Sequence, residues 1–184
     1  MKKLAAHLAA IALGIVAVTG CGGNDGGVKG NSKMDMQEAA EKADALVYRT
    51  FGAVRPPLDW THEASDHGSC DGSDEYGDVT RRAVVMTKVS AELFSASSSG
   101  TGLRVTKVVS DKEFPEGYAE TEDGLLRTGL VVGGQGQFFL DVQTACVRMS
   151  QVEAPGTQAR GHSYYSKDVP RPNVTDPVTS LLVV

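Results

Sequence analysis

Two turn signals in the second half of the chain separate three strand-like segments, and this pattern constrains the fold more than any other feature. Leu125 to Val132 begins after Asp123-Gly124, a dipeptide that favours a tight hairpin because both positions can adopt positive φ. The turn-forming run Gly133 to Gly136 then leads into Gln137 to Arg148, where apolar and polar residues alternate as on a half-buried strand. With Tyr118 to Thr121 before the first turn, these segments predict an antiparallel meander.

A capping-box pattern predicts the start of a long helix. Asp35 can accept hydrogen bonds from free backbone N–H groups, and the side chain of Glu38 can bond back to the cap. The helix is expected from Met36 to Thr50, before Gly52 and Pro56-Pro57 end it. Its apolar residues recur at helical spacing: Met36, Ala39, Ala40, Ala43, Leu46, Val47 and Phe51. The polar residues are expected largely on the opposite face: Gln37, Glu38, Glu41, Lys42 and Asp44.

Three further segments are strand-like. Leu58 to Glu63 and Leu103 to Val109 alternate in character, and Val79 to Val89 is rich in Val, Thr and Met. A polar loop is expected around Cys70. Together these segments predict an α+β domain over residues 35–150, with one N-terminal helix packed on an antiparallel sheet of four or five strands.

The N-terminus is typical of an exported chain. Met1-Lys2-Lys3 precedes an apolar run from Leu4 to Val18, shorter than the about 20 apolar residues of a membrane-spanning helix. Val18-Thr19-Gly20-Cys21 resembles the bacterial lipobox, in which the cysteine is diacylated and the chain is cut before it. The resemblance implies a lipoprotein signal peptide over residues 1–20 and a lipid anchor on Cys21, at the outer face of the cell membrane. An ordinary secretory signal with an incidental Cys21 is the alternative.

Glycines and prolines mark the segments outside the domain. The run from Gly22 to Ser32 cannot bury apolar area, so residues 21–34 are expected to form a flexible tether. After Glu153 the chain is polar and rich in proline, and residues 151–184 are expected to be extended or disordered.

Cys70 and Cys146 form an even pair once Cys21 is assigned to the lipid. In an oxidising extracytoplasmic compartment such a pair usually forms a disulfide. A zinc site is the competing interpretation, but zinc sites usually include short Cys-x-x-Cys spacings, and these residues are 76 apart.

The layout as a whole resembles a group of small actinobacterial lipoproteins of unassigned function. The resemblance covers about residues 1–148 and is carried by the lipobox, Trp60, Cys70, Phe114-Pro115 through Asp123-Gly124, and Gly133 to Gly136 through Cys146. It implies a helix packed on an antiparallel sheet and no established activity. It also implies a second helix between the second and third strands, where this chain departs from the pattern because Ala91 to Gly102 is short and serine-rich.

The net charge excludes a basic, nucleic-acid-binding surface. Removing residues 1–20 leaves 164 residues, enough for one ordinary domain, and takes away only Lys2 and Lys3 as charges. The remaining 16 Lys and Arg stand against 23 Asp and Glu, a formal net charge of −7. Nucleic acid is therefore not expected as a partner.

Acidic residues and a histidine crowd around Cys70: Asp66, His67, Asp71, Asp74, Glu75 and Asp78. Converging carboxylates can hold Ca²⁺, but their spacing misses the calcium-loop template, so a solvated acidic loop is favoured. His62, His67 and His162 lack metal-binding spacings, and no serine lies in Gly-x-Ser-x-Gly. We predict no metal, cofactor or catalytic residue from these patterns.

Trp60, the only tryptophan, is the candidate for a ligand-facing aromatic residue. With Tyr48, Phe51 and Tyr118 it either packs in the core or lines a groove. The core is favoured, because a domain poor in aromatic residues needs its large side chains inside.

The favoured interpretation is a non-catalytic binding or accessory module of the cell envelope, acting on an envelope protein, a lipid or a cell-wall component. One alternative is a cell-envelope hydrolase that uses Asp and His from residues 59–78. Another is a structural or inhibitory partner protein.

Overall fold

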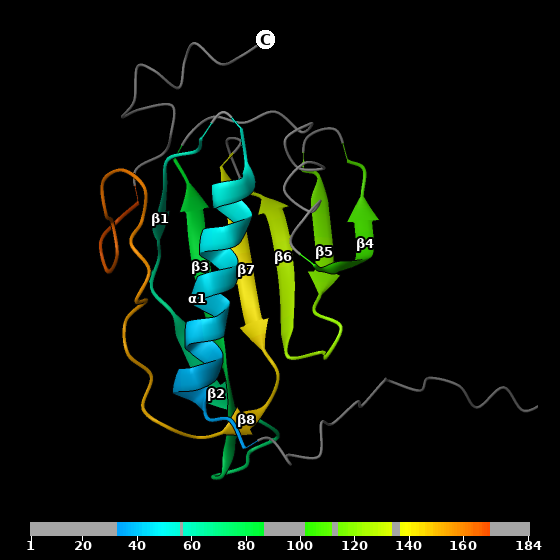
Figure 1. Ribbon diagram of the computed structural model, residues 1–184, viewed down its shortest axis with the longest axis vertical. Coiled ribbons are helices and arrows are strands. Elements are labelled where there is room, and N and C mark those ends of the chain that lie inside the picture. Colours follow the sequence, from blue (N-terminus) through cyan, green and yellow to red (C-terminus); the bar gives the residue numbers. More distant parts are fainter. Residues whose placement is uncertain (1–32, 56, 87–101, 112–113, 134–136, 170–184) are drawn as a thin grey trace, which may run out of the picture.

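The computed structural model describes residues 33–55, 57–86, 102–111, 114–133 and 137–169. One helix, α1 (Met36–Ala53), packs on one face of an antiparallel sheet (Figure 1), which confirms the predicted α+β class. The sheet has eight strands, so the expected four or five were too few. The strands are β1 (Trp60–His62), β2 (Asp66–Ser69), β3 (Tyr76–Val85), β4 (Arg104–Val109), β5 (Glu116–Glu120), β6 (Leu126–Val132), β7 (Phe138–Thr144) and β8 (Val147–Arg148).

Several predicted segments lie outside the described residues. They are the signal peptide, Cys21 and almost all of the tether, the end of the predicted 79–89 strand, nearly all of the segment 91–102, and residues 170–184. Within the described chain no helix is long and apolar enough to cross a membrane.

The predicted capping box is present at the start of α1. Asp35 Oδ1 accepts a hydrogen bond from the Glu38 N–H (3.0 Å), and the Asp35 N–H donates to Glu38 Oε2 (3.2 Å). The helix ends at Ala53 rather than Thr50, where the extended Val54 forms its C-cap. Its apolar side chains are buried against the sheet, as predicted. Asp44 is buried among them at 2% exposed, so its expected place on the solvent-facing side is wrong.

The meander of β5, β6 and β7 is confirmed, and β3 pairs with β7 on its far side. The main order is β1-β3-β7-β6-β5-β4, so β1 and β4 lie at the two edges. β2 and β8 pair with the N-terminal half of β3. The sequence missed β2 because all its residues are exposed and show no apolar alternation, so only its ladder with β3 makes it a strand. β8 is the end of the predicted 137–148 strand, which is interrupted after Thr144.

The hairpin at Asp123-Gly124 forms with one residue at positive φ. Gly124 has φ 69°, while the Asp123 carboxylate accepts hydrogen bonds from the Thr121 hydroxyl (2.6 Å) and the Leu125 N–H (3.0 Å). These bonds to its oxygen lower the pKa of Asp123.

Cys70 and Cys146 form the predicted disulfide, with their Cα atoms 6.1 Å apart. It joins the turn between β2 and β3 to the break between β7 and β8. The bond therefore fixes the lower end of the sheet, beside the start of α1 (Figure 1).

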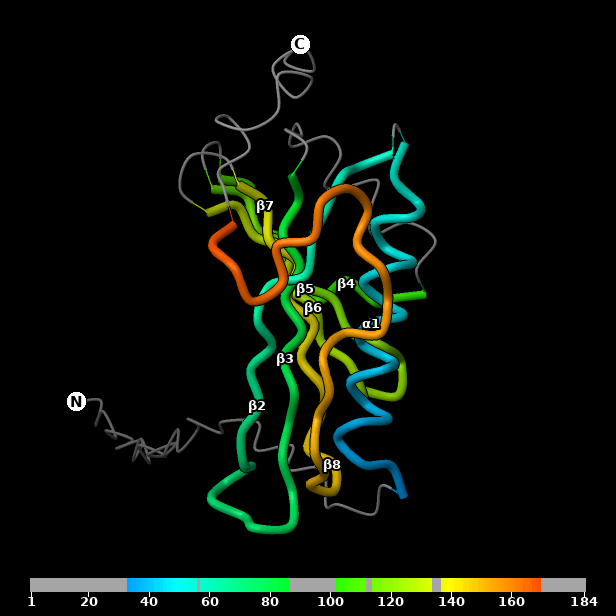
Figure 2. Tube along the Cα trace, turned by 90° about the vertical axis from the view of Figure 1, so that its left-hand side faces the viewer, coloured from blue at the N-terminus to red at the C-terminus, as the bar shows by residue number. Residues whose placement is uncertain are grey.

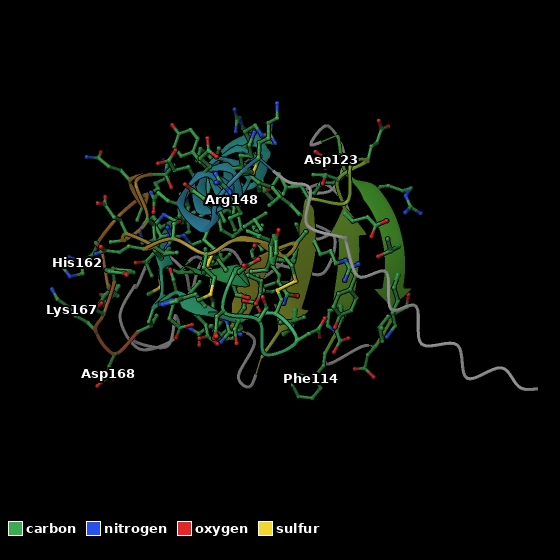
Figure 3. The ribbon with its side chains drawn as sticks, turned by 90° about the horizontal axis from the view of Figure 1, so that it is seen from below. Phe114, Asp123, Arg148, His162, Lys167 and Asp168 are labelled. Carbon is green, nitrogen blue, oxygen red and sulfur yellow. A yellow bond between two sulfur atoms is a disulfide. The ribbon has the colours of Figure 1, made fainter. Side chains whose placement is uncertain are left out.

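The two faces of the sheet differ. The face under α1 carries apolar residues, while the opposite face carries Arg82, whose guanidinium bonds to Asp141 (2.6 and 2.9 Å) and lies over the Phe139 ring. The strand register places Tyr118 on that same opposite face. Figure 3 shows Phe114 on this side of the sheet and Arg148 on the side of α1.

The described part of the tail, residues 151–169, contains no helix or regular strand. It runs from β8 along the opening between α1 and the β1 edge of the sheet, as the orange tube in Figure 2 shows. An isolated bridge pairs Arg160 with Trp60 of β1. This part of the tail therefore lies on the domain and closes one of its sides.

Candidate functional site

A buried ion pair joins α1, β3 and the tail. Arg81 of β3 and Asp44 of α1 are 1% and 2% exposed, and Arg81 Nε lies 3.0 Å from Asp44 Oδ1. Arg81 also donates to Ser65 Oγ (2.6 Å) and to the Glu153 carbonyl oxygen (2.8 Å), while Asp44 Oδ2 accepts from the Gly156 N–H (3.1 Å). Burial raises the pKa of Asp44, and the nearby Arg81 opposes this. The pair thus holds the first part of the tail to the core.

His62 of β1 makes the next contact with the tail. Its Nε2 lies 3.0 Å from the Thr157 carbonyl oxygen and 2.9 Å from the Thr157 hydroxyl. Because a carbonyl oxygen only accepts, Nε2 carries the proton, and the buried Nδ1 has no hydrogen-bond partner among the described residues. Burial lowers the pKa of His62 to about 4, so the ring is neutral at neutral pH.

Two bonds from β1 hold the rest of this segment. The Trp60 N–H donates to the Arg160 carbonyl oxygen (2.9 Å), and Thr61 Oγ1 accepts from the Tyr164 N–H (2.8 Å). We call residues 153–164 the strap. It is held by side chains and isolated backbone bonds rather than by a regular ladder.

An open groove of about 530 Å³ lies between the C-terminal part of α1 and the strap. We call it the α1–strap groove. Phe51, Leu58 and Trp60 are nearly fully buried and form its apolar part, with the Phe51 and Trp60 rings 5.3 Å apart. The other described lining residues are Tyr48, Gly52, Arg55, Pro57, Gln158, Ala159 and Arg160.

The four aromatic residues predicted to lie in the core or in a groove occupy different places in the structure. Trp60 and Phe51 belong to the core and also line the groove, whereas Tyr48 is 56% exposed at its side. Tyr118 is on the opposite face of the sheet, where its hydroxyl donates to Glu116 Oε2 (2.9 Å) and its pKa is raised by that bond.

The acidic residues around Cys70 are divided between an exposed strand and turn and a second, smaller hollow. Asp66 and His67 are exposed on β2, and Asp71 lies in the following turn with φ 50°. A second hollow of about 370 Å³ is lined by Asp35, Asp74, Glu75, Tyr76, Arg148 and Met149. No group of three or more His, Cys, Asp and Glu side chains in the described chain is arranged to hold a metal ion.

The remaining sequence candidates lie at the surface or beyond the described chain. The His162 ring meets the Tyr164 ring edge-on (4.6 Å between centroids), and the tail residues His162, Lys167 and Asp168 lie at the outer side of the molecule (Figure 3). Ser163 and Ser166 are exposed.

Sequence reasoning missed the polar residues that position the strap. Asp44 follows Ala40 by four residues and precedes Val47 by three, a spacing that places it on the apolar stripe of α1. Arg81 alternates with the buried Val79 and Ala83, so it also faces inward. These two signals were present in the sequence, whereas nothing in it indicated that Thr157 and Arg160 return to β1.

Comparisons of this chain with protein-family models, with curated proteins and with solved structures found no match.

Proposed function

We propose that the protein is a lipid-anchored, extracytoplasmic binding module that takes a small ligand in the α1–strap groove. The groove is the observation on which the proposal rests. Its volume of about 530 Å³ is within the range of about 300–1,000 Å³ typical of small-molecule sites. Its lining combines aromatic residues with a few polar ones, Arg55, Gln158 and Arg160. The lipobox-like motif ending at Cys21 supports the location.

Binding is favoured over hydrolysis by the arrangement of the candidate acid and base groups. A general base must lie within hydrogen-bond reach of its partner or of the reacting group. The side chains of His67 and Asp71 are exposed and form no hydrogen bond with each other within the described residues. His62 is buried, and its Nε2 is engaged by Thr157.

The groove lies away from the proposed anchor. The described chain starts beside the N-terminus of α1, whereas the groove is at the other end of this 18-residue helix. A helix of that length extends about 27 Å. With the tether at its N-terminus, α1 can hold the groove away from the membrane surface, which favours a ligand from the surrounding envelope.

The binding proposal is tested by filling the groove. Gly52 lines the groove, and a Cβ there meets no atom within 4 Å, so Gly52→Leu adds a side chain to the groove wall that starts in free space. Gly68→Leu is the matched control, because a Cβ there also meets no atom within 4 Å and no residue of β2 is among the described lining residues of the groove. The probe is the neutral dye N-phenyl-1-naphthylamine, whose fluorescence rises in apolar sites. We expect Gly52→Leu to weaken dye binding at least about tenfold and Gly68→Leu to leave it unchanged.

The location is tested by Cys21→Ala in the full chain. We expect the parent to carry an acyl group on Cys21 and to lose residues 1–20, and the variant to show neither change, because acylation needs the thiol. Equal processing of parent and variant, read by mass spectrometry, would refute the anchored part of the proposal. Unchanged dye binding by Gly52→Leu would refute the binding part.

A further inference from the structure

Arg55 supplies a cation to the α1–strap groove. Its Nη1 donates to the carbonyl oxygens of Gly52 (2.6 Å) and Val54 (2.7 Å), which fixes the guanidinium at the end of α1. Arg55 forms no ion pair within the described chain, and its Nε and Nη2 hydrogens make no hydrogen bond there. A guanidinium held in place with free donors is suited to bind an anion.

Arg160 supplies a second cation from the strap side. Its backbone is fixed by the bond from the Trp60 N–H, and its Nε lies 3.4 Å from Asp59 Oδ1. The side chains of Arg160 and Asp59 are 58% and 45% exposed, so this pair is weak and screened by solvent. The two Nη groups of Arg160 have no hydrogen bond to any described residue.

The charge of the groove is opposite to that of the chain as a whole. The described lining residues include Arg55 and Arg160 but no Asp or Glu, whereas the full chain has a formal net charge of −5. Counting Asp59 beside Arg160, the groove has one net positive charge, which complements a monoanion.

The apolar part of the groove limits what the anion can be. Tyr48, 56% exposed, supplies most of the accessible aromatic surface, whereas Phe51 and Trp60 are almost fully buried and reach the groove only at their edges. An inorganic anion would leave this surface in water. An extended peptide would need a free strand edge, and the Trp60 N–H of β1 is already bonded to Arg160.

We infer, building on the proposed function, that the groove binds a small carboxylate with an aromatic or branched aliphatic group. The apolar group lies against the exposed ring of Tyr48 and the small accessible parts of Phe51 and Trp60. The carboxylate accepts hydrogen bonds from Arg55 and Arg160, since guanidinium donors match carboxylate geometry. Arg55 and Arg160 are thus the residues that select the charge of the ligand.

A matched pair of ligands tests the inference. The full chain is titrated with 3-phenylpropanoate and with its neutral amide, 3-phenylpropanamide, and binding is followed by the fluorescence of Trp60, the only tryptophan. A hydrogen bond to a charged group contributes about 1.5–3 kcal/mol, and about 1.4 kcal/mol corresponds to a tenfold change in affinity. We therefore expect the carboxylate to bind at least about tenfold more tightly than the amide.

Three variants locate the effect. Arg55→Gln and Arg160→Gln are each expected to weaken carboxylate binding about tenfold and amide binding much less, so that the preference for the carboxylate is reduced. Arg127→Gln, an exposed arginine of β6 outside the groove, is the control and should change neither. Retained dye binding also shows that Arg55→Gln still folds after losing its bonds to the end of α1.

The outcomes separate this inference from the proposed function. If the carboxylate and the amide bind equally and Gly52→Leu still weakens dye binding, the charge selection is overturned and the binding module stands. If Gly52→Leu binds the dye as tightly as the parent does, both are overturned. Binding of a peptide with a C-terminal Phe but not of 3-phenylpropanoate overturns the small-molecule assignment.

Discussion

The two edges of the sheet differ in what lies beside them. At the β1 edge, the strap is bound through the buried side chains of Arg81, Asp44 and His62 and through a backbone bond from Trp60. At the other edge, β4 pairs only with β5 among the described strands, and almost all of its residues are exposed. Val108 of β4 faces the same side of the sheet as the buried Leu140 but is 60% exposed, because α1 packs over β3 and β7.

This difference shows how an irregular segment can cover a sheet edge. A strand would satisfy the edge through a ladder of backbone bonds. The strap has few such bonds, so charged and polar side chains from α1, β1 and β3 bind its backbone instead. The β1 edge is therefore more sensitive to charge and to pH than the β4 edge.

The largest effect is expected from Arg81→Met. It leaves Asp44 buried without its partner and removes the bonds to Ser65 and Glu153, so the free energy of unfolding should fall by about 3–5 kcal/mol. The matched control is Arg82→Met, the next residue, whose ion pairs with Asp141 and Glu63 are on the solvated face. Its cost should be about 0–1 kcal/mol.

Urea denaturation measures both variants, and hydrogen exchange at the Gly156 and Tyr164 amides reports on the strap. Faster exchange at these amides is expected for Arg81→Met only. Similar losses of stability in the two variants would contradict the distinction between the buried and the solvated arginine.

An intermediate effect is expected from pH, through His62. Its pKa is about 4 in the fold against an ordinary value of 6.5, so the unfolded chain binds more protons between these values. The free energy of unfolding should therefore fall as pH drops through this window, by about 2 kcal/mol between pH ~7 and ~4.5. Asp44 acts in the opposite direction. Its pKa is raised from the ordinary value of 3.8, so the folded state takes up a proton at a higher pH than the unfolded chain does, which offsets part of the loss of stability.

His62→Gln provides the comparison, since its amide can still donate to the Thr157 carbonyl oxygen but does not titrate. Urea denaturation at both pH values should show a flatter dependence for the variant than for the parent. An equally steep dependence in both would exclude His62 as its origin.

The smallest effect is expected from Val108→Thr at the β4 edge. An exposed substitution of similar shape should change the free energy of unfolding by no more than about 0.5 kcal/mol. Val142→Thr makes the same chemical change at a residue of β7 that is 0% exposed, and burial of the hydroxyl should cost about 1–3 kcal/mol. Thermal denaturation of the pair measures this, and a loss at Val108 as large as at Val142 would mean that β4 is covered in solution.

The sequence by itself determined the elements whose signals are local. The Asp35 and Glu38 capping box, the alternation in β7 and the turn at Gly124 depend on neighbouring residues, so α1 and the meander could be predicted. The disulfide also followed from an even pair of cysteines in a chain whose N-terminus predicts export. Strand β2 was missed because its exposed residues carry no pattern and only pairing with β3 defines it.

Only the tertiary structure decided the candidate site. The α1–strap groove needs Gln158 to Arg160 to lie beside α1, a contact between segments about a hundred residues apart that no local spacing encodes. Asp44 was placed on the wrong face because a carboxylate is expected in water unless a partner is known, and its partner Arg81 comes from a different element. The polar side chains that bind the strap became recognisable only when the fold brought them together, since their burial is stable only with every partner present.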